Sequence, residues 1–90
     1  MRKSEIKHEA MLSHLGFAVY ERRLSSGMSQ QDLADKTGLH RTYISDIERG
    51  TRNFTVSTLG RIAYALDTTA SKLFRLAESQ IIESSKARAR

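Results

Sequence analysis

The fold of this chain is decided by residues 27–50, which read GMSQQDLADKTGLHRTYISDIERG. Near the start of this stretch, Ser29 is typical of a residue that caps the N-terminus of a helix. Asp32, three positions later, completes a capping box, in which two side chains satisfy amide groups that the first turn leaves free. Met28 lies where an apolar residue packs back onto the first turn as a hydrophobic staple. The stretch therefore predicts a helix that begins after Ser29 and ends about two turns later, at Gly38.

Another helix, the third of the chain, is predicted to follow the turn and to end at Gly50, because glycine readily adopts the left-handed conformation of a helix C-cap. At about 100° per residue, its polar side chains fall in one band about 140° wide, whereas Ile44 and Ile47 face the other way. The polar band consists of Arg41, Thr42, Ser45, Asp46 and Arg49. His40, at the start of this helix, is a weak cap. Two helices joined by a glycine turn, the second with a polar band, predict a helix-turn-helix at about residues 29–49.

Three further helices are predicted by apolar residues that recur at helical spacing. The first helix, before the motif, has two apolar stripes: Leu12, Leu15 and Val19 on one side, and Phe17, Tyr20 and Leu24 on the other. The fourth and fifth helices carry the stripes Leu59, Ile62, Ala63 and Leu66, and Leu73, Phe74, Ala77 and Ile81. Thr55 or Ser57 can cap the fourth helix, and Thr69 can cap the fifth. We therefore expect an all-α chain of five helices in one compact domain, with both stripes of the first helix covered.

The composition allows a single small domain with an anionic partner. The chain has 90 residues, and its 15 Lys and Arg against 10 Asp and Glu give a net charge of +5. We expect a polar arm or helix extension at residues 1–10, the domain at residues 11–83 and a basic tail at residues 84–90. Positive charge favours nucleic acid as a partner, yet residues 29–56 carry four basic and four acidic side chains. The case for DNA therefore depends on where individual arginines lie.

Several function classes are disfavoured by the residue types that the chain lacks. The absence of cysteine excludes disulfides and thiolate metal sites, and the three histidines show no ligand spacing. Because no nucleophile motif of a hydrolase is present, we expect neither an enzyme nor a bound metal or other cofactor. No apolar run is long enough to span a bilayer, so we expect no membrane contact. A cytoplasmic location fits these features.

The polar band of the third helix has the chemistry of a DNA reader. A helix fits the major groove of B-DNA, which is about 12 Å wide, and the residues at its N-terminal end meet the base edges. Arg41, at that end, can donate two hydrogen bonds to O6 and N7 of guanine. Thr42 offers a hydroxyl and a methyl group to a base edge or a phosphate. Asp46 can accept from cytosine N4, or it can orient Arg41 or Arg49.

Residues 13–76 resemble the lambda-repressor-like (XRE-type) helix-turn-helix domain. The resemblance is carried by GMSQQDLA at residues 27–34, Gly38 and YISDIERG at residues 43–50. It implies a homodimer that binds a palindromic operator in double-stranded DNA. It also implies that the protein regulates transcription, either as a repressor that occludes a promoter or as an activator that contacts RNA polymerase.

A shorter stretch narrows the resemblance to one group of regulators. RTYIS at residues 41–45, followed by Arg52-Asn53, is similar to controller proteins of restriction–modification systems. The same string occurs in many chromosomal and phage regulators of the family, so a restriction–modification controller is one of several forms that the regulator can take.

The resemblance also implies roles for individual residues. The base-reading positions are Arg41, Thr42, Ser45 and Asp46. The positions that contact the DNA backbone are Gln30, Arg52 and Asn53, and we expect Tyr43 and Arg49 to contact it as well. A structural pair, Arg23 with Glu48, links the first and third helices. The first-turn amides near Gln30 favour an anion there in any case. For Tyr43, a ring packed on the turn with its hydroxyl in water is the alternative.

Apolar residues on the first and last helices are the candidates for a dimer interface. They are Phe17, Tyr20, Phe74, Ile81 and Ile82. A dimer would place two reading helices on half-sites about 34–36 Å apart, or a multiple of that distance. Two alternatives stay open. These residues can cover one another within one chain, or they can bind a different protein, as in an antitoxin-type module whose main role is to bind a partner.

Overall fold

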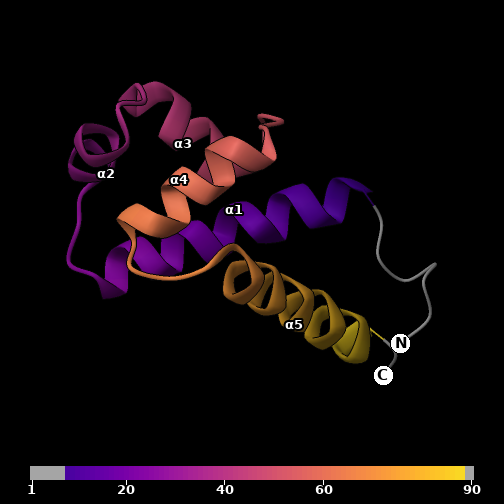
Figure 1. The fold of residues 1–90 in the computed structure, drawn as a ribbon. Coiled ribbons are helices and arrows are strands. Elements are labelled where there is room, and N and C mark those ends of the chain that lie inside the picture. Colours follow the sequence, from indigo (N-terminus) through magenta and orange to yellow (C-terminus); the bar gives the residue numbers. More distant parts are fainter. Residues whose placement is uncertain (1–7, 89–90) are drawn as a thin grey trace.

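Residues 8–88, the part of the chain that the computed structural model describes, form five α-helices and no strand (Figure 1). Side chains are described within residues 11–83. The helices are α1 (His8–Ser25), α2 (Gln30–Thr37), α3 (Arg41–Arg49), α4 (Val56–Ala65) and α5 (Ala70–Arg88). The expected all-α fold with five helices is confirmed, and the predicted helix-turn-helix corresponds to α2 and α3.

The starts of α2 and α4 follow caps that the local sequence supplies. In the capping box of α2, Ser29 Oγ accepts from the Asp32 amide at 3.0 Å, and Asp32 Oδ2 accepts from the Ser29 amide at 2.9 Å. At the start of α4, Thr55 is the cap and Ser57 is not, because the Thr55 hydroxyl accepts from the Thr58 amide at 3.1 Å. Residues close in sequence therefore fix where these two helices begin.

One apolar core lies between the five helices. Figure 1 shows α1 running across the molecule, with α5 along one side and α2 and α3 toward the other. The largest fully buried side chains are Val19, Leu33, Ile44, Ile47, Leu59, Ile62, Leu66 and Leu73. Every helix contributes at least one of them. Because burial of one such side chain stabilises a fold by roughly 1.5–3 kcal/mol, packing holds the short helices α2 and α3, which are too short to be stable alone.

The backbones of α1 and α3 come so close that two positions require glycine. A Cβ at Gly16 on α1 would lie 2.1 Å from the carbonyl oxygen of Ile47 on α3. Nearby, Gly50 has a φ of +73°, and a Cβ there would lie 2.6 Å from the Cα of Ser13. Neither distance leaves room for a side chain, because cores are already packed to near the density of organic crystals. This approach fixes the C-terminal end of α3 against α1.

The second apolar stripe of α1 differs from the expectation that both stripes are covered. Phe17, Tyr20 and Leu24 are 42%, 38% and 51% exposed in the single chain. The described helices bury the opposite stripe, which includes Leu15 and Val19, whereas the second stripe is only partly covered. The rings of Phe17 and Tyr20 pack against each other, with centroids 5.8 Å apart. A single chain therefore leaves an aromatic pair on its surface.

The ends of α1 and α5 can be compared with the expected boundaries between arm, domain and tail. α1 begins at His8 and α5 ends at Arg88, so helical backbone enters both the expected arm and the expected basic tail. Residues 1–7 and 89–90 lie outside the described residues. The boundaries between arm, domain and tail stay a prediction. No helix within residues 8–88 is long and apolar enough to cross a membrane.

Candidate nucleic-acid interface

α3 presents its polar band to solvent and its apolar face to the core. Ile44 and Ile47 are completely buried and hold the helix in place. The start of the helix is open, because His40 makes no side-chain capping hydrogen bond there. The polar band consists of exposed Arg41, Thr42 and Arg49 and half-buried Ser45 and Asp46. A helix held on one side and polar on the other can enter a groove of DNA without disturbing the fold.

A buried ion pair joins α1 to α3. Arg23 Nε donates to Glu48 Oε2 at 2.7 Å, and Arg23 Nη2 donates to Glu48 Oε1 at 3.1 Å. The two side chains are only 7% and 4% exposed. Arg23 Nη1 also donates to the carbonyl oxygen of Met28, just before α2, at 2.7 Å. The hydrogen bond to Glu48 raises the pKa of Arg23 above its usual value. The predicted contact is therefore present, and it ties α1 both to α3 and to the start of the helix-turn-helix.

Gln30, at the start of α2, connects this ion pair to Arg41 in the polar band of α3. Its Nε2 donates to Glu48 Oε1 at 3.0 Å, and its Oε1 accepts from Arg41 Nη1 at 3.3 Å. Gln30 itself is half-buried, whereas Arg41 is exposed. The sequence predicts a backbone contact for Gln30 and base readout for Arg41, but it does not predict that their side chains meet. Arg41 is thus joined to the buried pair through the amide group of Gln30.

Asp46 pairs with Arg49 on the same helix. Of the two partners that the sequence offers for its carboxylate, the structure brings Arg49 to Asp46 and leaves Arg41 with Gln30. The pair lies at the surface, with the Arg49 side chain 63% and the Asp46 side chain 21% exposed. An exposed pair of this kind adds little to stability, so its effect on a nearby phosphate or base is of more interest than its effect on the fold.

The loop between α3 and α4 places a further arginine, Arg52, beside α3. The Arg52 guanidinium lies 4.9 Å from the centre of the Tyr43 ring, within the range of a cation–π interaction. Arg52 and its neighbour Asn53 are exposed. The Tyr43 ring, which is half-buried, thus supports the loop from α3. Sequence reasoning named both residues for backbone contacts without predicting that they stack.

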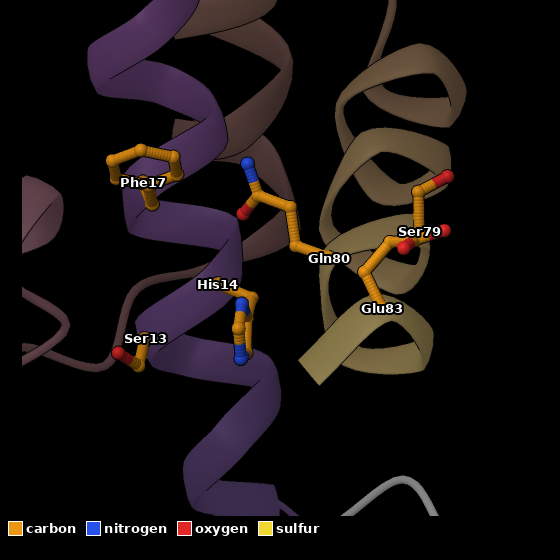
Figure 2. Close-up of a pocket in the computed structure, with 6 residues that line it drawn as sticks. All are labelled: Ser13, His14, Phe17, Ser79, Gln80 and Glu83. Carbon is orange, nitrogen blue, oxygen red and sulfur yellow. The ribbon is translucent and has the colours of Figure 1, made fainter. Parts of the chain in front are cut away.

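A groove lies between α1 and α5 (Figure 2). It has a volume of about 500 Å³ and is lined by Ser13, His14, Phe17, Ser79, Gln80 and Glu83. In Figure 2, the Gln80 side chain extends from α5 toward α1. Its Oε1 atom is buried, yet no donor in the described part of the chain reaches it. Since buried polar atoms are nearly always paired, this groove suits contact with another molecule.

The candidates for a dimer interface do not all lie at the surface. Phe17, Tyr20 and Phe74 are exposed, and Ile82 is half-buried. Ile81 is a correction to the prediction, because it is only 4% exposed and packs inside its own chain. Its position on α5 is one turn after Ala77, which is also buried, so both belong to the stripe that faces α1 and the core. Ile81 therefore drops out of the candidate surface.

Among residues 11–83, no group of three or more His, Asp or Glu side chains lies close enough together to hold a metal ion. The basic and amide side chains described above are donors of hydrogen bonds, which suit phosphate oxygens and the acceptor atoms of bases. The donor side chains in the polar band of α3 and in the loop after it therefore suit contact with a polyanion.

The helix-turn-helix family pattern matches residues 19–73, more than half of the chain. This chain belongs to the helix-turn-helix family. Within it, the chain is of the lambda-repressor-like (XRE) type and is similar to controller proteins of restriction–modification systems. The match begins at Val19 in α1 and ends at Leu73 in α5, so it contains the whole helix-turn-helix and the loop after α3.

Two control proteins show the similarity in sequence. C.BamHI from Bacillus amyloliquefaciens is 56% identical over 52 residues, which are 57% of this chain and 64% of that protein. C.SmaI from Serratia marcescens is 52% identical over 48 residues, which are 53% of this chain and 57% of that protein. The matched segment therefore spans less than two thirds of the length of either relative.

A solved structure shows the similarity in fold. The restriction–modification controller protein C.Esp1396I has been determined as a tetramer in complex with its natural 35 base-pair operator. It matches this helix-turn-helix protein with a TM-score of 0.73 and 40% sequence identity, over 80% of this chain and 95% of that one. This overlap is greater than for these two sequence relatives.

Proposed function

We propose that this protein is a sequence-specific, double-stranded DNA-binding regulator of transcription that acts as a homodimer on a palindromic operator. One observation carries the proposal: Arg41 is exposed at the N-terminal end of α3, while the opposite face of that helix is fixed in the core. That end of a helix is where base edges are met in the major groove. The similarity to C.BamHI, C.SmaI and operator-bound C.Esp1396I supports this function and favours a restriction–modification controller.

The proposed mechanism separates residues that specify a base from residues that position the protein. Arg41, Thr42, Ser45 and Asp46 read base edges, with Arg41 donating two hydrogen bonds to a guanine. Phosphate contacts come from Gln30, Tyr43, Arg49, Arg52 and Asn53. Asp46 also discriminates against wrong bases. When Arg49 moves to a phosphate, the Asp46 carboxylate becomes free to repel acceptor atoms and to accept from cytosine.

The homodimer is proposed to form through the exposed aromatic residues on α1 and α5. Phe17, Tyr20 and Phe74 are exposed and Ile82 is half-buried, so one chain leaves apolar side chains of both helices uncovered. The adjoining groove contains the unpaired acceptor of Gln80, which a second copy can satisfy. Because one helix reads only a few base pairs, a two-fold pair of α3 helices doubles the sequence that is recognised.

The remaining functional assignments follow from this reading. We propose that the protein is not an enzyme, acts in the cytoplasm and needs no metal or other cofactor. A regulator can repress by occluding a promoter or activate by contacting RNA polymerase. The choice between the two depends on where the operator lies relative to the promoter. The antitoxin-type module remains the alternative, but no observation favours it, because the relatives are control proteins.

Selection from a random duplex library tests the function. The protein is mixed with the library at about 0.15 M salt, where weak non-specific contacts are screened, and the bound duplexes are sequenced. We expect enrichment of an inverted repeat whose half-sites are separated by about one helical turn or a multiple of it. Enrichment of no sequence, with binding that fades uniformly as salt rises, would overturn sequence-specific readout.

A further inference from the structure

One side of α5 carries four side chains that recur at spacings of four, three and four residues. They are Lys72, Leu76, Ser79 and Glu83, which form the α5 row. At about 100° per residue they fall within a band about 60° wide. Leu76 is half-buried, and the other three are exposed. Spacings that alternate between three and four residues are those of the seam along which two helices pack. The α5 row therefore has the form of a packing seam that is largely exposed in a single chain.

Most of the α5 row lies outside the part of the chain that matches the family pattern. That match ends at Leu73, and three of the four members of the row come after it. Ser79 and Glu83 also line the groove between α1 and α5, together with Phe17 and His14 of α1 (Figure 2). The matched pattern therefore does not account for this side of α5, and the row needs an explanation of its own.

The α5 row has a basic end and an acidic end. Lys72 lies at its N-terminal end and Glu83 at its C-terminal end, and neither takes part in an ion pair within residues 11–83. Between them, Leu76 is large and apolar, whereas Ser79 is small. When the row is turned end for end, opposite charges meet and a large side chain meets a small one. The row is therefore complementary to a second copy of itself, which is the property that a two-fold interface requires.

We propose that the α5 rows of two copies pack against each other, with the two α5 helices antiparallel. Lys72 of each copy faces Glu83 of the other, and Leu76 of each copy packs on Ser79 of the other. Both contacts belong to one register, because each pair is centred between residues 77 and 78. The inference rests on the proposed function, in which the protein acts as a homodimer. It narrows the dimer surface to the side of α5 that faces away from Phe74.

The pairing also supplies a donor to the groove between α1 and α5. The Oε1 atom of Gln80 is buried there, and no donor in the described part of the chain reaches it. Gln80 and Glu83 line the same groove, so Lys72 of the second copy brings its ammonium group to the end of α5 where both acceptors lie. An ammonium group has three N–H donors and can serve more than one acceptor. The groove is thus incomplete in one chain and completed by the second.

Reversal of the charges at the two ends of the α5 row tests the pairing. Lys72→Glu brings two carboxylates together at each end of the paired helices, and Glu83→Lys brings two ammonium groups together. The double variant restores opposite charges in the reverse order. Lys36→Glu is the matched control, because it makes the same change of charge at an exposed position of α2. Sedimentation equilibrium of the full chain without DNA gives the dimer Kd at about 0.05 M salt, where charges are weakly screened, and circular dichroism confirms folding.

Each single reversal is expected to raise the dimer Kd by about 5- to 30-fold. The effect is larger than for one exposed ion pair, because the two-fold axis repeats every lost attraction and every new repulsion. The double variant should return to within about threefold of the wild type, since its charges are again opposite. Lys36→Glu should leave the Kd unchanged. At about 1 M salt the differences should shrink, because the charges are then screened.

A second measurement reports the register and does not depend on charge. The chain contains no cysteine, so Leu76→Cys and Ser79→Cys each introduce a single thiol. When the two variants are mixed and oxidised, we expect a crosslinked heterodimer to form faster than either crosslinked homodimer. The reason is that position 76 of one copy lies opposite position 79 of the other, and a disulfide requires its two Cα atoms to lie within about 7 Å of each other.

Two kinds of result would contradict the inference, and they differ in what they leave standing. If the wild type is a dimer but neither reversal raises its Kd, or if the double variant is as weak as the singles and no heterodimer crosslink is favoured, the pairing of α5 helices is wrong. A homodimer through another surface, and with it the proposed function, would stand. If the wild type stays monomeric both alone and on the selected operator, the homodimer itself is wrong and the inference falls with it.

Discussion

Gly16 in α1 packs directly on the backbone of Ile47 in α3, so closely that a Cβ at Gly16 would lie 2.1 Å from the Ile47 carbonyl oxygen. This contact holds α1, which bears the exposed Phe17 and Tyr20, against the C-terminal end of α3. The surface proposed for the dimer and the surface proposed for DNA are thus joined through backbone. In a dimer, this close packing would keep the distance between the two α3 helices constant.

Gly16→Ala is expected to destabilise the fold by about 1–3 kcal/mol, because the added methyl group forces α1 and α3 apart. The free energy of unfolding in urea measures the effect. The matched control is Gly60→Ala in α4, where an added Cβ meets nothing within 4 Å. There, alanine should stabilise by about 0.4–1 kcal/mol, since it reduces the freedom of the unfolded chain. Equal effects at the two positions would show that α1 and α3 do not touch as described.

The Arg23–Glu48 pair is expected to matter for stability. Glu48→Ala leaves a buried guanidinium without its partner and should cost about 3–5 kcal/mol in the free energy of unfolding. The double variant Arg23→Met with Glu48→Leu should recover much of that loss, because an apolar pair of similar size needs no charge compensation. Asp46→Ala, which breaks an exposed pair, should cost less than about 1 kcal/mol. A folded Glu48→Ala protein with unchanged melting and lost DNA binding would contradict the structural role of Glu48.

Arg52 is expected to act on the DNA backbone. Arg52→Ala should weaken binding to all sequences by a similar factor and reduce the slope of log affinity against log salt by about one. Tyr43→Phe keeps the ring beneath Arg52 and should change the salt slope little, because a phenyl ring still supports a cation–π contact. Anisotropy titrations at several salt concentrations measure both quantities. A changed base preference in Arg52→Ala would assign the residue to base readout instead.

The capping box of α2 is expected to weaken in acid. Hydrogen bonds from the Ser29 amide and hydroxyl lower the pKa of Asp32 below its usual value. A carboxylate whose pKa is lowered by folding stabilises the protein above the pKa of the unfolded chain, and this contribution is lost as the pH falls through the lowered pKa. The difference in stability between the wild type and Asp32→Ala should therefore be largest near neutral pH and shrink in acid. A difference that stays constant down to the acid limit would rule out the ionised cap.

Much of the fold follows from short-range patterns in the sequence. The capping box at Ser29 and Asp32, the glycine that ends α3 and the inward positions of Ile44 and Ile47 all depend on residues within one or two turns of each other. Local hydrogen bonding and helical periodicity determine these features, so they can be predicted before any tertiary contact is known. The band of polar residues on α3 follows in the same way.

Other features depend on contacts between residues far apart in the chain. The closeness of Gly16 to Ile47, the stacking of Arg52 on Tyr43 and the burial of Ile81 are set by how whole helices pack. One of them left a signal in the sequence. A glycine inside a helix costs about 1 kcal/mol relative to alanine, so Gly16 is a position where a packing reason can be sought, but Gly60 in α4 has the same signal and no close neighbour. The meeting of Gln30 and Arg41 left no comparable signal.

Readout of one base pair by Arg41 is the central claim, and a single comparison tests it most directly. Wild type and Arg41→Ala are titrated against the selected operator and against operators changed at each position. We predict that Arg41→Ala costs about 1–3 kcal/mol on the operator and abolishes the preference at one base pair in each half-site. An equal loss of affinity on every duplex would contradict the account, because Arg41 would then be a phosphate contact that carries no sequence information.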